Sequence, residues 1–190
     1  MLQTTEQLQT RIEALEAKDD IRALITAYGI ACDDHDLPGL MDLFTEEAKY
    51  DSANGEMVAT GKTAIEEMFI RTFKTRGPSF HWTHDITIVL SDETPDRATG
   101  LVLSHAETSP NGITSLAAMR YADQYQRGKD GRWRIAQRTI SFLYYTPAAD
   151  YVSVFGALER VNMAGGCHPA DHPEKLPSWQ AFARHYGNAT

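Results

Sequence analysis

Residues 81–90 read HWTHDITIVL and contain the pattern that decides the fold. Ile86, Ile88 and Leu90 alternate with polar residues, and this period of two is typical of a strand with one buried face. Turn signals of the Asn-Gly and Asp-Gly type separate further stretches of strand-like sequence. The sequence therefore predicts a meander of long antiparallel strands, over residues 81–90, 97–108, 113–127 and 132–145.

Upstream of this meander, apolar residues recur every three or four positions, which is typical of helices. The first helical pattern ends near the acidic cluster at 33–36, and either one broken helix or two helices would fit it. Asp36 can cap a short second helix, and another helix is expected after Gly61. Between them, the dipeptide Asn54-Gly55 predicts a tight hairpin with a type I′ turn. Helices before long strands indicate an α+β fold, with N-terminal helices packed on one face of a curved antiparallel sheet.

The chain beyond the strands is expected to be an extension and not a second domain. We assign residues 1–146 to one domain, and residues 147–190 to a C-terminal helical extension packed on that domain or on a neighbouring subunit. One helix is predicted over residues 150–161, and Ser178 is expected to cap a last helix with an aromatic stripe.

Composition and charge exclude several classes of function. The 190 residues are 42% hydrophobic and 23% charged, which is ordinary for a globular protein with one core. The net charge of -8 disfavours nucleic acid as a partner, because a polyanion would be repelled. The sequence contains neither an apolar run long enough for a bilayer nor a signal-peptide pattern, so we expect a cytoplasmic protein with no membrane partner. Cys32 and Cys167 are isolated and predict no disulfide framework.

Three residues are candidates for chemistry: Asp33, His81 and Arg138. Asp33 follows the apolar stripe of the first helix, where it could point toward the core or cap the next helix. A histidine that a buried carboxylate orients is a general base near neutral pH, so His81 gains significance if it meets Asp33. Arg138 lies among apolar residues of the last long strand. Two roles would explain a charged residue at this position. Arg138 could form an ion pair with Asp33 or a glutamate, or it could donate a hydrogen bond to a substrate oxygen.

Other polar residues are weaker candidates. His84 lies in the same strand as His81 but has the opposite parity, so only one of them faces the concave side unless a bulge intervenes. Metal-ligating residue types also cluster late in the chain, at Cys167, His168, Asp171 and His172. The proline-rich context of this late cluster disfavours a metal site, and none is predicted.

Four segments together resemble the SnoaL-like (nuclear-transport-factor-like) family of cone-shaped, cystatin-like folds. They are residues 24–50, the GKTAI motif at 61–65, residues 80–90 and residues 120–141. The resemblance spans about residues 15–146. The spacing is similar to that of two lyases of this family, bile-acid 7α-dehydratase and hexachlorocyclohexane dehydrochlorinase.

The resemblance implies roles for particular residues. In those lyases an aspartate after the first helix and a histidine beginning the strand after the third helix are catalytic, and here these positions hold Asp33 and His81. The resemblance further implies substrate-binding positions at Tyr28 and Arg138 and, with a less secure alignment, at Tyr50 and His105. His84 is a further substrate-binding candidate because of its place in the strand of His81. It also implies an enzyme that needs no cofactor and forms a homo-oligomer, either a dimer or a trimer.

These implications predict a dehydratase-like lyase that removes a proton from a hydrophobic cyclic substrate, such as a steroid, terpenoid, polyketide or aromatic compound. His81, oriented by Asp33, would be the base. Two alternatives stay open: an isomerase or cyclase of the ketosteroid-isomerase type at the same site, and a non-catalytic ligand-binding or assembly subunit.

Overall fold

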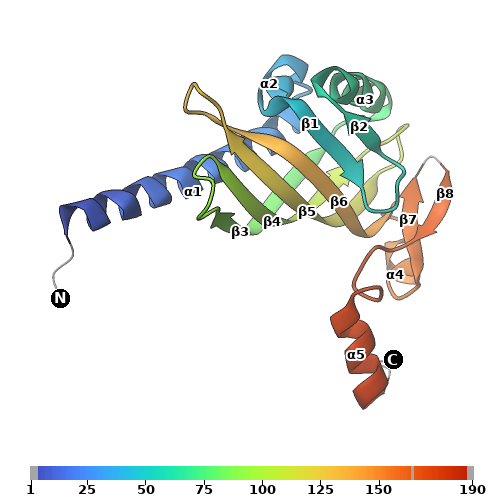
Figure 1. The fold of residues 1–190 in the computed structure, drawn as a ribbon. Helices are drawn as coiled ribbons and strands as arrows, with labels where there is room; N and C mark the ends of the chain where they lie inside the picture. The colour runs from blue at the N-terminus through green and yellow to red at the C-terminus, as the bar shows by residue number, and fades with distance from the viewer. Residues whose placement is uncertain (1–3, 164, 188–190) are drawn as a thin grey trace.

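A strongly curved sheet with helices on its inner face forms the body of the protein (Figure 1). The computed structural model describes residues 4–163 and 165–187. The helices are α1 (Thr5–Asp33), α2 (Leu37–Asp42), α3 (Lys62–Thr75), α4 (Tyr151–Val154) and α5 (Pro177–Tyr186). The strands are β1 (Phe44–Ser52), β2 (Val58–Thr60), β3 (Phe80–Leu90), β4 (Arg97–Thr108), β5 (Ser115–Arg127), β6 (Trp133–Pro147), β7 (Glu159–Met163) and β8 (Gly166–Pro169). The predicted α+β class, with N-terminal helices on a curved sheet, is confirmed.

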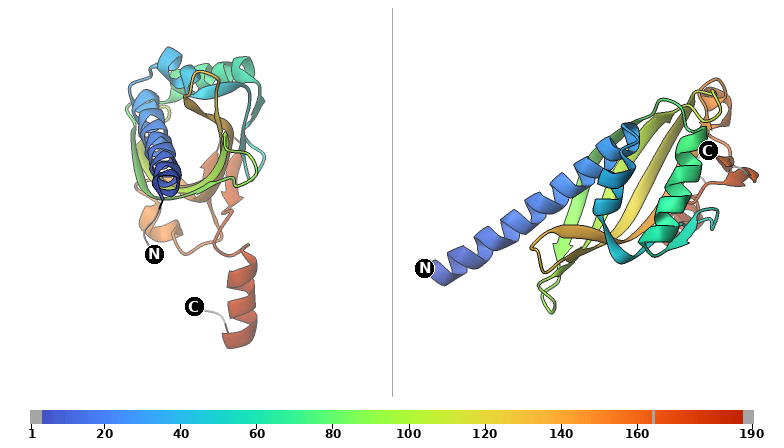
Figure 2. Two further views of the ribbon diagram at one scale, coloured as in Figure 1. Left: turned by 60° about the vertical axis from the view of Figure 1, so that its left-hand side comes forward. Right: turned by 90° about the horizontal axis from the view of Figure 1, so that it is seen from above.

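The sheet has the strand order β2-β1-β6-β5-β4-β3, and its four long strands form the predicted antiparallel meander. Two pairings depart from the antiparallel pattern. β1 runs parallel to β6 and places Tyr50 opposite Arg138, and β7 pairs with β6 in parallel fashion, with Val161 opposite Tyr145. Figure 2 shows the sheet curling around the face on which α1 and α3 lie. Successive residues of a strand point to opposite faces, so this inner face collects the buried side chains of the long strands, among them Val102, Tyr121 and Ile135.

α1 is a single unbroken helix, which decides between the two forms that the sequence allowed. The Thr4 hydroxyl caps it by accepting a hydrogen bond from the Gln7 N–H at 3.2 Å. Only the second half of α1 packs on the sheet, because its buried residues begin at Ala17 and end at Cys32. The first half extends beyond the sheet (Figures 1 and 2). Among the helices in the described part of the chain, none is long and apolar enough to cross a membrane.

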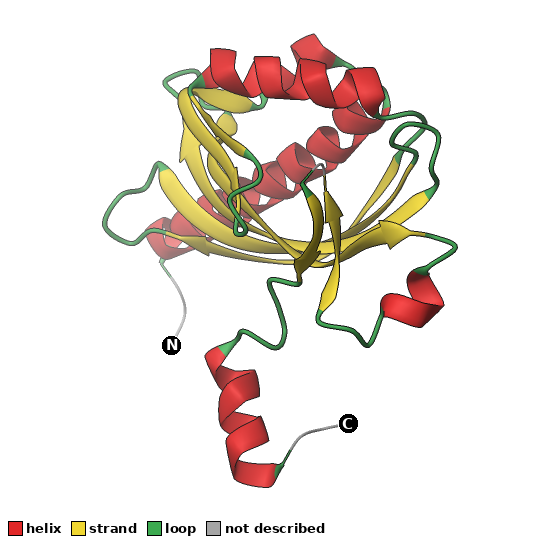
Figure 3. Cartoon of the chain, turned by 90° about the vertical axis from the view of Figure 1, so that its right-hand side faces the viewer, coloured by secondary structure: helices red, strands yellow, loops and turns green. Residues whose placement is uncertain are grey.

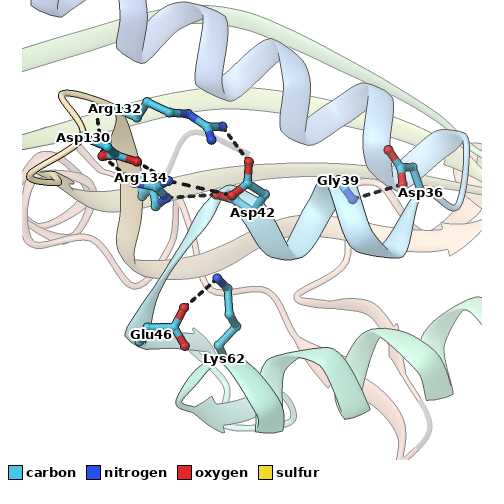
Figure 4. Close-up of polar contacts among 8 residues, drawn as sticks. All are labelled: Asp36, Gly39, Asp42, Glu46, Lys62, Asp130, Arg132 and Arg134. Carbon is cyan, nitrogen blue, oxygen red and sulfur yellow. Dashed lines mark hydrogen bonds and ion pairs between the residues drawn. The ribbon is translucent and has the colours of Figure 1, made fainter.

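α2 begins at the predicted cap, because Asp36 Oδ1 accepts a hydrogen bond from the Gly39 N–H at 3.0 Å (Figure 4). At the other end of this helix, Asp42 Oδ2 accepts a bond from the Arg132 guanidinium at 2.6 Å. The Arg134 Nε also donates to the Asp42 carbonyl oxygen, at 3.2 Å. These contacts tie α2 to the start of β6. They lie at the surface, where one ion pair contributes only about 0–1 kcal/mol.

The connection between β1 and β2 differs from the predicted type I′ turn. The two strands pair in antiparallel fashion, but residues 53–57 form a longer loop between them. Gly55 has a positive φ of 79°, whereas Asn54 does not adopt the positive φ that a type I′ turn requires. The Asn54 side chain explains the wider loop, since its Oδ1 accepts hydrogen bonds from the Ser52 hydroxyl at 2.7 Å and the Glu56 N–H at 3.2 Å.

The extension after β6 is helical only in part. The helix predicted over residues 150–161 ends with α4, and the chain then forms the hairpin β7–β8, which rises beside the sheet in Figure 3. Arg160 holds this hairpin in place. Its buried guanidinium donates to the backbone carbonyls of Leu143 at 2.7 Å and His172 at 3.2 Å, and to the Glu174 carboxylate at 2.9 Å.

The last helix begins differently from the prediction. Leu176 is the residue at its cap, Pro177 occupies its first position, and Ser178 therefore makes no capping bond. α5 stands away from the sheet in Figure 1. Its aromatic stripe is exposed, at Trp179, Phe182 and Tyr186.

Candidate active site

A carboxylate from α1 and an imidazole from β3 meet where the two elements approach each other. Asp33 is the last residue of α1, and its Oδ1 lies 2.6 Å from Nδ1 of His81. The other carboxylate oxygen accepts the His81 backbone N–H at 2.8 Å, and the Ser79 hydroxyl donates to Oδ1 at 3.1 Å. Gly29 of α1 also lies next to His81, since a Cβ added there would make an ordinary van der Waals contact with the His81 Cβ at 3.7 Å. The structure thus brings together two of the three residues that the sequence singled out.

The bonds around Asp33 decide which imidazole nitrogen is free. Burial acts to raise the pKa of Asp33, but hydrogen bonds from the side chain and backbone of His81 outweigh it, and the pKa is lowered. An ionised carboxylate only accepts hydrogen bonds, so the proton of a neutral His81 ring lies on Nδ1. Nε2 then holds the free lone pair. The side chains are 8% exposed for His81 and 15% for Asp33, which leaves the pair shielded but accessible.

His81 lines a small cavity of about 70 Å³ on the inner face of the sheet. Its wall is largely aromatic and apolar, and includes Tyr28, Tyr50, Met119, Tyr121, Ile140 and Phe142. A groove of about 340 Å³ adjoins this cavity and shares Tyr145 and Met163 with it. Met163 belongs to β7, so the extension supplies part of the wall that separates the cavity from the groove.

Two tyrosine hydroxyls face each other in the cavity wall. Tyr28 Oη and Tyr50 Oη lie 2.9 Å apart, so one hydroxyl donates to the other. Burial raises the pKa of both phenols, which keeps them protonated. The hydroxyl that accepts within this pair therefore still has its own proton to donate to a bound oxygen. The sequence named both residues as substrate-binding candidates, and the structure places both in the cavity with His81.

Arg138 lies behind the cavity wall and not on it. Its side chain and that of Asp123 are both 0% exposed, and Nε and Nη2 donate to the Asp123 carboxylate at 2.9 and 2.6 Å. The Tyr125 hydroxyl adds a bond to the same carboxylate at 2.7 Å. Of the two explanations that the sequence left open, this geometry favours the ion pair. The partner is Asp123, not Asp33 or a glutamate.

The Arg138 guanidinium also supports the tyrosines of the cavity. Its Cζ lies 4.0 Å from the centre of the Tyr28 ring and 4.3 Å from that of Tyr121. A cation held between aromatic faces is attracted by both rings. Burial lowers the pKa of Arg138, but the Asp123 carboxylate outweighs burial, and the net shift is well upward. Arg138 therefore stays charged and fixes the position of Tyr28.

His84 and His105 lie on the opposite, outer face of the sheet. His81 pairs with Ala106 across β3 and β4, and both line the cavity, so His105 points the other way. His84 Nε2 lies 2.7 Å from His105 Nδ1, and both line a separate outer groove of about 520 Å³. The structure does not bring these two predicted residues to the site of His81, because strand alternation separates them from it.

The late cluster of metal-ligating residue types does not converge on one point. Cys167 is exposed, whereas the Asp171 carboxylate accepts the Phe142 backbone N–H at 2.8 Å. Within the described residues, no group of three or more histidine, cysteine, aspartate or glutamate side chains is arranged to hold a metal ion.

Comparison with protein families identifies the group to which this cone belongs. Residues 13–139 match the model of the SnoaL-like domain. The chain is a member of the SnoaL-like family. The matched residues include Asp33, His81 and Arg138 and end before the extension. No curated protein matches the chain in sequence.

Several solved structures share the fold. LinA type 2, a hexachlorocyclohexane dehydrochlorinase, superposes with a TM-score of 0.65 at 16% identity, over 72% of this chain and 92% of its own. A scytalone dehydratase-like protein of Novosphingobium aromaticivorans superposes with a TM-score of 0.65 at 18% identity, over 72% of this chain and 91% of its own. The dehydrochlorinase LinA-type3 of Novosphingobium barchaimii superposes with a TM-score of 0.65 at 17% identity, over 73% of this chain and 94% of its own. At these identities the likeness shows the fold alone.

Three residues of the site region escaped the sequence interpretation. Asp123, the partner of Arg138, lies between Tyr121 and Tyr125 at inward-facing positions of β5, and this alternation could have identified it. Arg76 follows α3 and lines the cavity, but no periodic pattern marks it. Met163 lies in a segment of the extension where no strand was predicted.

Proposed function

We propose that this SnoaL-like protein is a cofactor-independent, dehydratase-like lyase acting on a hydrophobic cyclic compound. The observation that carries the proposal is the 2.6 Å contact between Asp33 Oδ1 and His81 Nδ1 at the wall of a cavity. The family relationship supports it, since the dehydrochlorinases and the dehydratase-like protein share this cone.

His81 is the base in this mechanism. Asp33 holds the ring with its proton on Nδ1, so Nε2 removes a proton from a substrate carbon that a neighbouring carbonyl or conjugated system acidifies. The Asp33 carboxylate also stabilises the imidazolium that forms. The same proton then serves the leaving group, which departs as water or as another acid. Each step uses only groups that the chain supplies.

The Tyr28–Tyr50 pair stabilises the charge that develops when the proton leaves. Deprotonation next to a carbonyl places negative charge on its oxygen, and a protonated tyrosine is a suitable donor to that oxygen. Because Tyr50 bonds to Tyr28 at 2.9 Å, the two hydroxyls act as one donor unit. Loss of one donor of this kind typically costs about a hundredfold to a thousandfold in turnover.

The dimensions of the site indicate how a substrate is arranged. Ligand pockets usually measure about 300–1,000 Å³, so the cavity of about 70 Å³ accommodates only the reacting end of a cyclic compound. The adjoining groove of about 340 Å³ is large enough for the remainder. Tyr145 and Met163 are shared by the two spaces, and we infer that the substrate passes between them.

The test is a screen of steroid, terpenoid, polyketide and aromatic compounds, with product mass as the readout. A product lighter by one water or one acid is expected, and the activity should disappear in His81→Ala and Asp33→Asn while both variants retain near wild-type thermal stability. His84→Gln is the matched control, since it alters a histidine of the same strand on the outer face and should keep full turnover. Full activity of His81→Ala would contradict the proposal.

The same screen separates the other functions. Isomerisation uses the same base and the same hydroxyl donors, and it returns a product of unchanged mass with a moved double bond. A ligand that binds without turnover, or a larger protein that copurifies, would assign a binding or assembly subunit. We further infer that the protein is cytoplasmic. We also infer that it forms a homo-oligomer, either a dimer or a trimer, and light scattering of the purified chain tests this oligomeric state.

A further inference from the structure

Arg76 is held against the cavity by the backbone on either side of it. It is the residue that follows α3, and it forms a β-bridge with Pro110 in the turn between β4 and β5. The Gly77 N–H donates to the Ser109 carbonyl at 3.1 Å. A Cβ on Gly77 would lie 3.0 Å from that carbonyl oxygen, so glycine permits the close approach. Arg76 is thereby placed in the wall of the same cavity as His81.

The charge of Arg76 has no counterpart in the described part of the protein. Its side chain is half-buried and makes neither a hydrogen bond nor an ion pair with any residue that the structure describes. The two carboxylates of the site are already occupied, since Asp33 binds His81 and Asp123 binds Arg138. Partial burial removes some of the water around this charge, so a bound group of opposite charge would be stabilised there.

The field of Arg76 reaches the interior of the cavity wall. Burial raises the pKa of Cys32 to about 11, and the largest opposing influence is the positive charge of Arg76. Burial likewise raises the pKa of Tyr121, and Arg76 is again among the charges that act against it. A guanidinium after the end of a helix also interacts favourably with the helix dipole, but that role does not require a place in the cavity.

We propose that Arg76 binds a carboxylate of the substrate, so that the ligand of this cavity is an anionic ring or conjugated compound. A guanidinium matches a carboxylate with two parallel hydrogen bonds, and the aromatic wall suits the apolar part. The small cavity leaves room for few atoms between Arg76 and His81, so the carboxylate lies near the carbon that loses its proton. Arg76 acts in binding and specificity, whereas His81 acts in proton transfer. The assignment of this carboxylate to a substrate rests on the proposed function.

The test compares probes of equal shape and different charge. Benzoate is paired with benzamide and cinnamate with cinnamamide, and their dissociation constants are measured by calorimetry with the full chain. We expect the wild type to bind the carboxylates about tenfold to a hundredfold more tightly than the amides, because the carboxylate accepts charge-assisted bonds. Arg76→Gln should abolish this preference, and Arg76→Lys should retain part of it. Arg71→Gln removes an exposed charge from the same helix and should leave the preference unchanged.

Several outcomes would overturn the assignment of Arg76. They are equal affinity for both members of a pair in the wild type, no carboxylate binding at all, a preference that survives in Arg76→Gln, or one that Arg71→Gln also removes. Unfolding curves of each variant show that the comparison is made on folded protein. If Arg76→Gln does not fold, Arg76→Lys decides, since wild-type preference in that variant would also overturn the assignment.

A further variant separates this inference from the proposed function. His81→Gln should retain the full preference for carboxylates, because the base plays no part in binding the anion. If no compound is turned over while the preference persists, the lyase proposal fails and the anion site stands. If neutral compounds are turned over and Arg76→Gln leaves their KM and kcat unchanged, the anion site fails and the lyase proposal stands.

Discussion

Two hydrogen-bonded pairs on the inner face of this protein, each formed by an aspartate and a nitrogen-containing side chain, differ in how far they are buried. The pair between Arg138 and Asp123 lies between β5 and β6, and both of its side chains are 0% exposed. The pair between His81 and Asp33 joins β3 to α1, with side chains 8% and 15% exposed. In the first pair both carboxylate oxygens are bonded and the guanidinium is enclosed by two tyrosine rings. In the second pair one ring nitrogen stays free beside a cavity.

The difference between the two pairs shows how burial assigns a role to a charged group. An enclosed pair cannot lose a partner without leaving an isolated charge in the core, so it fixes the structure around it. The proposed function requires that the pair at the cavity wall exchange protons with a ligand, which costs little structurally because that pair is not enclosed. Tyr28 connects the two regions, because its ring lies over Arg138 and its hydroxyl bonds to Tyr50.

The largest effect is expected from breaking the enclosed pair. Asp123→Asn leaves the Arg138 charge buried without a counterion, and it should lower the free energy of unfolding by about 3–5 kcal/mol. Replacing both residues by apolar ones, as in Asp123→Leu with Arg138→Met, should recover much of this loss. Urea unfolding measures the loss of stability in the single variant and its recovery in the double variant. If Asp123→Asn changed stability by less than about 1 kcal/mol, the structural role assigned to the pair would be wrong.

The next effect concerns the residue that joins the two regions. Tyr28→Phe keeps the ring over Arg138 but removes the hydroxyl, so turnover should fall by about a hundredfold while the melting temperature changes little. Tyr121→Phe is the matched control, since its ring also lies over Arg138 and its hydroxyl bonds to the Met119 sulfur at 3.3 Å. Equal losses in the two variants would show that the Tyr28 hydroxyl has no special part in catalysis.

A smaller effect is expected at the wall between cavity and groove. Met163→Ala should join the two spaces and improve the affinity of two-ring relative to one-ring aromatic ligands by about tenfold, because more apolar surface is then buried. Met57→Ala is the control, since Met57 lines the cavity but not the groove. If calorimetry showed an unchanged ligand preference in Met163→Ala, the C-terminal extension would not contribute to ligand specificity.

The smallest effect is the contribution of Asp33 to stability. The pKa of Asp33 in the folded protein lies below its ordinary value of 3.8, so the ionised carboxylate stabilises the fold above that value. The contribution is lost as pH falls through the folded pKa. The difference in unfolding free energy between wild type and Asp33→Asn should therefore be constant above about pH 5 and shrink below about pH 4. A difference that grew toward acid would mean that the carboxylate is destabilised by folding.

The fold and the positions of Asp33 and His81 could be predicted from the sequence because both depend on local periodicity. The apolar stripe of α1 ends one position before Asp33, and the alternation in β3 begins at His81, so both residues could be placed at the ends of elements that pack together. Tyr28 shares that stripe. The family resemblance then supplied a reason for the two elements to meet.

Other features depend on contacts between distant segments, which periodicity does not encode. Arg76 lies between a helix and a turn, and only the packing of residues 109–111 against it places it in the cavity. The sequence did not decide which face of the sheet His84 and His105 occupy, and the structure places both on the outer face. The first residues of β7 were taken for the end of the helix predicted over residues 150–161, because five residues of strand are too short to show alternation when Arg160 itself is buried.

The central claim is that Asp33 fixes the tautomer of His81 so that Nε2 is the base, and ¹⁵N NMR of histidine-labelled protein tests it most directly. His81→Gln assigns the signals. At a pH where the ring is neutral, the proton should lie on Nδ1 and Nε2 should be bare, and Asp33→Asn should remove this preference. A proton found on Nε2 in the wild type, or a tautomer unchanged in Asp33→Asn, would contradict the account.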